Sequence, residues 1–138
     1  MPELERTTFL RRPAAAPKKT ADPTATLTFN TGDVTRVTGA VLIGRNPSAD
    51  AGEDVELTVT VDDESRKLSR THLRIEWHDG SLWATDRDSG NGTTIERAGA
   101  IPAQLAPWQP FRLHDQDVAV LGDMRVTISL KDITVMGL

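Results

Sequence analysis

The chain has 138 residues, of which 38% are hydrophobic, and this is enough for one domain around a single packed core. Its formal net charge is −4, yet residues 1–20 carry five cations against Glu3 and Glu5, so the remaining residues are strongly acidic. An acidic body excludes nucleic acid as the main partner, because a phosphate backbone needs a broad basic face.

The chain contains no cysteine, so disulfides and thiolate metal sites are excluded. No apolar stretch approaches the roughly 18 residues of a membrane span, and the N-terminus lacks the apolar region of a secretory signal. These features predict a cytoplasmic protein without direct membrane insertion. Twelve arginines against four lysines, with many alanines, are typical of a GC-rich bacterial gene.

Residues 1–25 have no apolar period, and prolines at positions 13, 17 and 23 prevent a stable helix. We therefore expect a disordered tail over residues 1–25 and a folded domain over residues 26–138. Within the tail, Thr7 and Thr8 stand between Arg6 and the apolar Phe9, in a segment that a kinase can reach. Both are candidate phosphorylation sites, although ordinary linker threonines would look the same.

The folded part alternates apolar and polar residues with a period of two, which is typical of β-strands with one buried face. Hairpin turns are expected at residues 30–33 and at Asp79-Gly80. No long segment has a helical period, so the chain predicts an all-β sandwich or barrel. The clearest alternating runs are residues 26–29, 55–61, 73–78, 82–85 and 124–131.

The segment 97–110 is less regular because it holds three prolines. We expect an edge strand there, followed by a loop around Trp108 in which the tryptophan caps the core.

Three polar groups stand where strand-like runs end, and a β-sandwich gathers such loops on one rim. Gly44-Arg45 follows an apolar run, Ser69-Arg70-Thr71-His72 precedes another, and Asn91-Gly92-Thr93 follows a third. The arginine guanidinium can hold two phosphate oxygens at once, and serine hydroxyl and asparagine amide groups add further donors. This combination predicts a site for a phosphate group and the peptide that carries it.

These residues resemble the forkhead-associated (FHA) domain, a phosphothreonine-reading β-sandwich, over residues 26–130. The stretch DRDSGNGT at residues 86–93 and the hairpin RLHDQDVAVLG at residues 112–122 belong to the same resemblance. It implies a two-sheet antiparallel sandwich without a cofactor or catalytic residue. Its expected partners are a phosphothreonine protein or peptide and a serine/threonine kinase.

The resemblance also assigns roles to individual residues. Arg45, Ser69 and Arg70 are expected to hold the phosphate, and Asn91 to bond to the backbone of the bound peptide. The structural support of this site is expected to come from Gly44, His72, Gly92 and Thr93. The tail is similar to the paired-threonine tails of small actinobacterial FHA proteins, so its own phosphorylated form is a further expected ligand.

Two features depart from the family pattern. The spacer between Arg45 and Ser69 is longer than usual, with extra residues expected in 47–54. Gly90 stands where many members carry a polar side chain that helps to hold phosphate or peptide.

The sequence raises three alternatives. An FHA fold can bind a partner independently of phosphate through a face of the sandwich. A hydrolase using Ser69 and His72 with Asp86 or Asp88 would need a nucleophile elbow, and no G-x-S-x-G motif is present. A metal site is not expected, because the three histidines lie far apart and lack ligand spacing.

Overall fold

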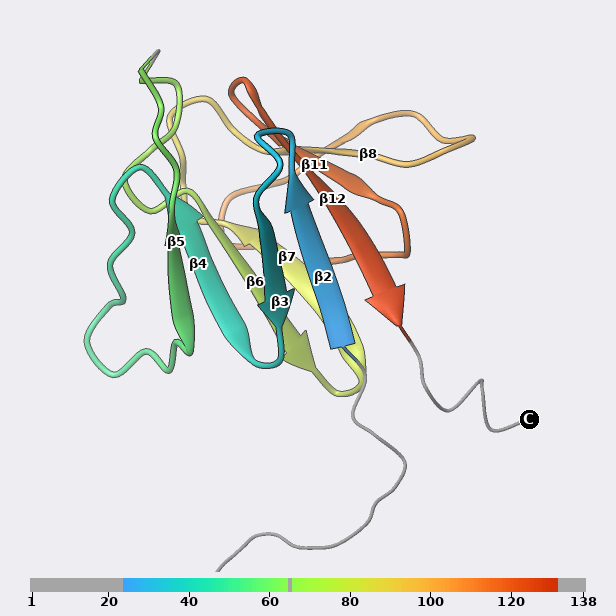
Figure 1. The fold of residues 1–138 in the computed structure, drawn as a ribbon, viewed down its shortest axis with the longest axis horizontal. Coiled ribbons are helices and arrows are strands. Elements are labelled where there is room, and N and C mark those ends of the chain that lie inside the picture. The colour runs from blue at the N-terminus through green and yellow to red at the C-terminus, as the bar shows by residue number, and fades with distance from the viewer. Residues whose placement is uncertain (1–23, 65, 132–138) are drawn as a thin grey trace, which may run out of the picture. The chain divides into compact units, whose positions relative to one another are not determined.

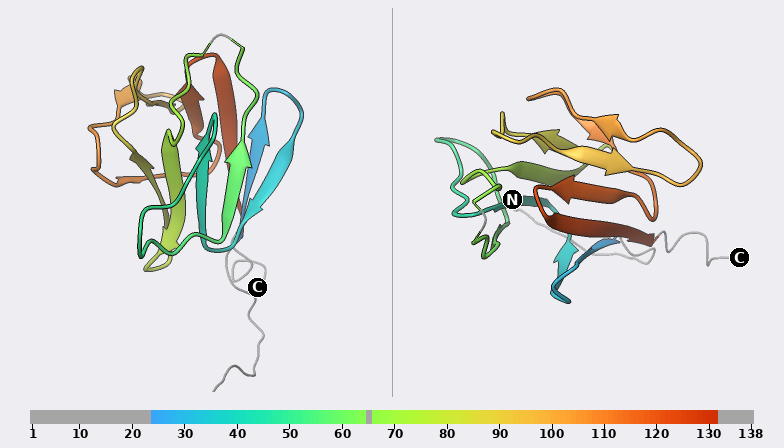
Figure 2. Two further views of the ribbon diagram at one scale, coloured as in Figure 1. Left: turned by 90° about the vertical axis from the view of Figure 1, so that its left-hand side faces the viewer. Right: turned by 90° about the horizontal axis from the view of Figure 1, so that it is seen from above.

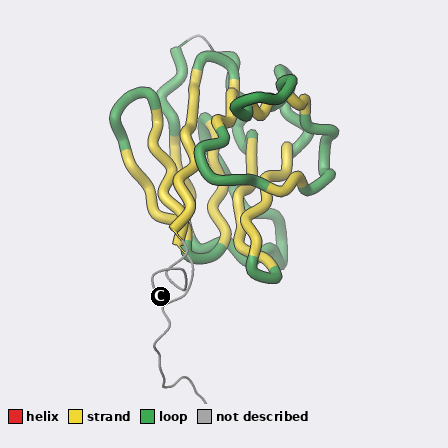
Figure 3. The backbone as a smooth tube through the Cα atoms, turned by 90° about the vertical axis from the view of Figure 1, so that its right-hand side faces the viewer, coloured by secondary structure: helices red, strands yellow, loops and turns green. Residues whose placement is uncertain are grey.

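The computed structural model describes residues 24–64 and 66–131, and residues 24–130 form one compact unit. Its regular structure is entirely β-strand (Figure 3), which confirms the all-β prediction. The first described strand begins at Thr24, so the last two residues of the expected tail, Thr24 and Ala25, belong to a strand. Thr7, Thr8 and the remaining tail residues, 1–23, lie outside the described residues. The strands, in chain order, are β2 (Thr24–Phe29), β3 (Val34–Val37), β4 (Ala40–Gly44), β5 (Leu57–Thr60), β6 (Leu73–His78), β7 (Ser81–Asp86), β8 (Thr94–Glu96), β9 (Ala103–Gln104), β10 (Phe111–Arg112), β11 (Val118–Leu121) and β12 (Met124–Lys131).

The strands form two sheets of a sandwich (Figures 1 and 2). One sheet has five strands in the order β10-β7-β6-β4-β5, and the other has six in the order β3-β2-β12-β11-β8-β9. The turn at Asp79-Gly80 joins β6 to β7 as predicted, with positive φ angles of 52° and 78°. Of the described strand pairs, β4 and β5 are parallel and the others are antiparallel.

Aliphatic side chains from both sheets form the core, because alternate residues of each strand point to the same face. The alternation predicts these faces well in the central strands. It predicts them less well at the sheet edge, where Leu57 of β5 is 43% exposed because no further strand covers it. The largest fully buried aliphatic side chains of this core are Leu27, Ile43, Leu73, Ile75, Leu82, Ile95, Leu113, Leu121 and Ile128.

The long spacer after Arg45 has a structural explanation. Since β4 and β5 run parallel, the chain must return from the end of one strand to the start of the other, and this requires a crossover of about a dozen residues. Residues 45–56 make that return, visible beside β4 and β5 in Figure 1. Its far end is fixed by the Glu56 amide, which donates to the Ala40 carbonyl at 2.9 Å.

Ion pairs hold this spacer against the outer face of the five-stranded sheet. Glu53 contacts both Arg74 of β6 and Arg87, and Arg87 also pairs with Asp50 at 2.8 Å. Burial alone would raise the pKa of Glu53, but hydrogen bonds from Arg87 and Arg74 hold it below the ordinary value. On the same face, Leu42 is fully buried outside the main core cluster.

The prediction that Trp108 caps the core is wrong. Trp108 is 54% exposed, and the irregular segment that carries it connects β9 to β10, which are edge strands of the two sheets. The expected edge strand in this segment is confirmed, because β9 is the last strand of the six-stranded sheet. The part of the chain that the structure describes has no helix long and apolar enough to cross a membrane.

Candidate functional site

Three loops from distant parts of the sequence meet at one end of the sandwich, at the upper left of Figure 1. They follow β4, precede β6 and follow β7, and we call residues 45–48, 66–72 and 87–93 together the rim. The first two are joined by backbone hydrogen bonds of 3.0 Å, from Arg45 to Ser69 and from Asn46 to Arg70. The rim is therefore an extension of the strand ladder, and its loops are held in fixed register.

Gly44 allows these two loops to approach. A Cβ at this position would overlap the carbonyl oxygen of Arg70 and lie 2.7 Å from its carbonyl carbon. Because these are backbone atoms, rotation of a side chain cannot relieve the overlap. Gly44 is thus required for close packing, and its φ is not in the left-handed region.

His72 lies fully buried beneath the rim and connects two of its loops. The Ser69 amide donates to His72 Nδ1 at 3.1 Å, and His72 Nε2 lies 2.9 Å from the Gly92 carbonyl oxygen. Since Nδ1 accepts, Nε2 must carry the proton, and the imidazole is neutral. Both ring nitrogens are used by backbone partners, so the ring does not act as a base toward the Ser69 hydroxyl in this arrangement.

This arrangement predicts a pH-dependent stability. Burial lowers the pKa of His72 below its ordinary value of 6.5, although the Gly92 carbonyl and the Asp86 carboxylate oppose the shift. The unfolded chain therefore binds more protons in mild acid than the folded chain does. The contribution of His72 to the free energy of unfolding should be fully present above pH 6.5, and it should decline as the pH falls below this value. Urea unfolding at pH 7.5 and 5.5 should show this decline in the wild type and a smaller one in His72→Gln. Equal declines in both proteins would contradict the assignment.

Ser69 presents its side chain at the rim. Its Oγ accepts a hydrogen bond of 2.9 Å from the Gly90 amide, which leaves the hydroxyl proton for another acceptor. The same bond joins the loop before β6 to the loop after β7. Gly90, which lacks the polar side chain common in the family, thus contributes through its backbone.

Asn91 links the same two loops from the other side. Its Nδ2 donates to the Lys67 carbonyl at 2.8 Å. The side-chain oxygen of Asn91 has no protein donor within the described residues, so it can accept from the backbone of a ligand. The positive φ of 79° at Gly92 completes the turn, and the Gln104 side chain packs closely against this glycine.

A buried carboxylate shapes the loop that carries Asn91. Asp86 Oδ1 accepts bonds of 2.6 Å from the hydroxyls of both Ser89 and Thr93, and Oδ2 accepts from the Ser89 amide at 3.0 Å. Asp86 and Thr93 are both buried. The loop is therefore closed at its base before any ligand binds.

Two cations of the rim have no counter-ion among the described residues. Arg45 and Arg70 form no ion pair within the described residues, and the Arg45 Nε lies 3.4 Å from the Leu68 carbonyl oxygen. Lys67, by contrast, pairs with Asp123 at 3.0 Å and is a support of the loop. Two guanidinium groups without an ion pair to the described residues, on loops that also carry the Ser69 hydroxyl, make this end of the domain suited to a phosphate dianion.

A hollow of about 600 Å³ lies next to Arg45 and was not predicted from the sequence. Its walls combine the two cations Arg45 and Arg66 with a run of three carboxylates. A lining of both cationic and acidic side chains cannot be recognised as a sequence motif, since acidic loop residues are common on any protein surface. The carboxylates are Asp62, Asp63 and Glu64.

An all-β sandwich with a cationic, pre-ordered rim of loops is typical of a ligand-binding domain. The FHA domain family matches residues 41–122 of the chain. The chain belongs to the FHA family. The FHA domain is a binding domain, and its presence is consistent with a non-catalytic protein.

Solved structures agree with this assignment. One, from a study of phosphothreonine-dependent FHA domain interactions, is 27% identical with a TM-score of 0.58, covering 78% of this chain and 97% of that one. The mycobacterial FhaA FHA domain, solved with the intracellular domain of Rv3910, is also 27% identical with a TM-score of 0.53, covering 78% and 99%.

The N-terminal FHA domain of Saccharomyces cerevisiae Rad53p, solved with a phosphothreonine peptide, shows the shared fold alone. It is 19% identical with a TM-score of 0.59, covering 83% of this chain and 98% of that one. No curated protein matches the chain.

The described residues contain no group of three or more His, Asp or Glu side chains that could hold a metal ion.

Proposed function

We propose that this domain binds phosphothreonine-containing peptides and acts as a non-catalytic module in serine/threonine-kinase signalling. The observation that carries the proposal is the rim, in which Arg45, Ser69 and Arg70 come together while His72 fixes the loops from beneath. A phosphothreonine has about −1.5 to −2 charges and strong acceptor oxygens. These match the Ser69 hydroxyl proton and the two guanidinium groups, which form no ion pair with the described part of the chain. FHA relatives solved with or studied for phosphothreonine ligands support the same ligand class.

Within this proposal, Arg45 is the principal phosphate clamp, with Ser69 and Arg70 as further phosphate donors. Asn91 holds the peptide backbone through its side-chain oxygen. Gly44, Gly92 and Thr93 support the site through close packing, a left-handed turn and a bond to a buried carboxylate, respectively.

A titration monitored by amide chemical shifts tests where the ligand binds. A degenerate phosphothreonine peptide library should shift the amides of Ser69, Arg70 and Gly90, because they surround the proposed phosphate position. The amides of Asp79 and Gly80, which lie at the opposite ends of the same strands, should move little. Shifts centred on those distant residues, or equal shifts with unphosphorylated peptides, would contradict the proposal.

We further propose that phosphorylation of Thr7 or Thr8 lets the tail occupy the rim of its own domain. Thr24, where β2 begins, lies 16 positions after Thr8 in the chain. A flexible chain of this length spans about 20–24 Å on average, and a fully extended one about 53–58 Å. Because the strands are short, this reach suffices to pass along the sandwich, and tethering raises the local concentration of the tail toward the millimolar range.

A kinase-phosphorylated chain should therefore bind a labelled phosphothreonine peptide more weakly than the unphosphorylated chain. A Thr7→Ala/Thr8→Ala double variant treated with the same kinase is the control, and it should bind like the unphosphorylated chain. Indistinguishable binding by all three proteins would rule out the switch. Blocking that increases with protein concentration would show that the tail reaches a neighbouring molecule instead.

A further inference from the structure

An exposed tryptophan stands in an unusual backbone conformation near the rim. Trp108 has a φ of 66°, which is rare and strained for a bulky residue, and 54% of the residue remains accessible to solvent. Neither the strain nor the exposure is explained by the core, to which this side chain contributes little. Strain of this kind persists only where neighbouring groups hold the residue firmly.

Two contacts hold Trp108 in this conformation. The Trp108 amide donates to the Asp86 carbonyl at 2.8 Å, and its ring lies over the Arg87 guanidinium at 4.8 Å from the ring centroid. The Arg87 side chain is only 5% exposed and is itself fixed by Asp50 and Glu53 of the spacer. The inner face of the indole is thus occupied by an immobilised cation, and the rest of the ring is presented to solvent in a fixed orientation.

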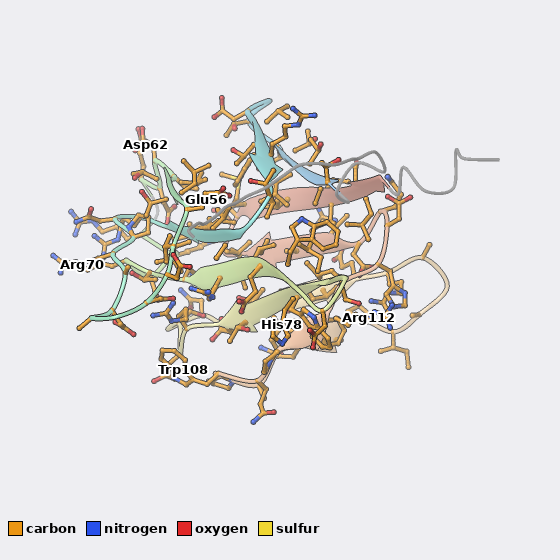
Figure 4. All side chains as sticks on the ribbon, turned by 90° about the horizontal axis from the view of Figure 1, so that it is seen from below. Glu56, Asp62, Arg70, His78, Trp108 and Arg112 are labelled. Carbon is orange, nitrogen blue, oxygen red and sulfur yellow. The ribbon has the colours of Figure 1, made fainter. Side chains whose placement is uncertain are left out.

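The same contacts place Trp108 next to the rim. Asp86, which accepts its amide, also closes the loop that carries Asn91. The segment leading to Trp108 runs beside this loop, since the Leu105 amide donates to the Thr93 carbonyl at 2.9 Å. In Figure 4, Trp108 lies closer than His78 and Arg112 do to the end of the molecule where Arg70 is found.

We propose that Trp108 is a specificity-determining residue that contacts an apolar side chain of the bound phosphopeptide, on the side where the peptide leaves the loop of Asn91. The proposal rests on the phosphopeptide-binding function proposed above. A rigid aromatic surface continuous with the rim offers contact area without an entropic cost of ordering. Because Asp50 lies beside Arg87 with its side chain 70% exposed, an acidic residue at this position of the peptide should be disfavoured.

The test uses phosphothreonine peptides that are otherwise alanine-rich, in which each flanking position carries leucine, alanine or aspartate in turn. The wild-type chain should prefer leucine over alanine at one flanking position, by roughly three- to tenfold for contact with an aromatic ring. Trp108→Ala should lose this preference while still distinguishing phosphorylated from unphosphorylated peptides, and Trp108→Phe should retain most of the preference. Ile101→Ala is the matched control, because it removes an 89% exposed apolar side chain elsewhere, and it should leave the preference unchanged.

The possible outcomes distinguish failure of the Trp108 proposal from failure of the phosphopeptide-binding function on which it rests. If Trp108→Ala binds the all-alanine phosphopeptide normally but keeps the leucine preference, Trp108 is not the contact while the phosphopeptide function stands. If the wild type has no leucine preference at any flanking position, the proposal is likewise overturned. If the wild type fails to distinguish phosphorylated from unphosphorylated peptides, both proposals fall. Loss of all binding in both Trp108 variants would show a structural role, and it too would overturn the assignment.

Discussion

Replacing Gly44 with alanine should destabilise the domain and abolish binding of a phosphothreonine peptide. The new methyl group would collide with the carbonyl group of Arg70, so the loop before β6 must move away from β4. Forcing extra volume into a packed site costs about 1–3 kcal/mol or more, and here the displaced atoms are backbone. That displacement would break the bonds of Arg45 to Ser69 and of Asn46 to Arg70, which hold the rim together. Thermal unfolding and peptide calorimetry together measure both effects.

Gly90→Ala provides the matched control for this substitution. A Cβ at Gly90 meets only the Ser69 Oγ, at an ordinary contact distance of 3.9 Å, and the residue does not have a positive φ. This variant should keep the stability of the wild type and most of its affinity. If Gly44→Ala proved as stable and as active as Gly90→Ala, the close approach of the two loops would not be needed for the site.

Replacing Arg45 with alanine should lower the affinity for a phosphothreonine peptide at least tenfold while leaving the fold intact. Its guanidinium has no ion pair within the described residues, and it contacts only the Leu68 carbonyl at the limit of a hydrogen bond. The variant therefore loses little within the protein, but it loses charge-assisted bonds to the ligand that contribute roughly 1.5–3 kcal/mol. Calorimetric titration and a thermal melt of the same samples test both parts.

Arg112→Ala removes the same charge at a distance from the rim. Arg112 is exposed on β10, and Figure 4 shows it far from Arg70. This control should bind almost as well as the wild type at physiological salt, because charges beyond a Debye length of about 8 Å are largely screened. Equal losses in the two variants would mean that Arg45 acts only through the net charge of the domain.

Much of the fold could be predicted from the sequence because it depends on local patterns. Alternating runs such as residues 73–78 and 124–131 became strands β6 and β12, and Asp79-Gly80 became the expected turn. The positions of Arg45, Ser69 and Asn91 at strand ends also correctly predicted that three loops meet at one end. Period-two alternation and turn chemistry are local properties, so they can be read without knowing the neighbours in space.

The parts that could not be predicted depend on contacts between distant residues. Arg87 pairs with Asp50 and Glu53, more than 30 residues earlier in the chain, and nothing in its local sequence identifies these partners. Trp108 was expected to cap the core because large aromatic residues are usually buried. Its exposure follows instead from the Arg87 guanidinium beneath it and from the amide bond to Asp86.

The most direct test of the central claim is a calorimetric comparison of one peptide in two forms, with and without phosphate on its single threonine. The sequence should be chosen by library selection against the wild-type chain. The rim predicts measurable binding of the phosphorylated peptide and a loss of at least tenfold when the phosphate is absent, since Arg45, Ser69 and Arg70 would then have no charged acceptor. Equal affinity for the two forms would contradict phosphothreonine recognition and favour a phosphate-independent interaction through another surface of the sandwich.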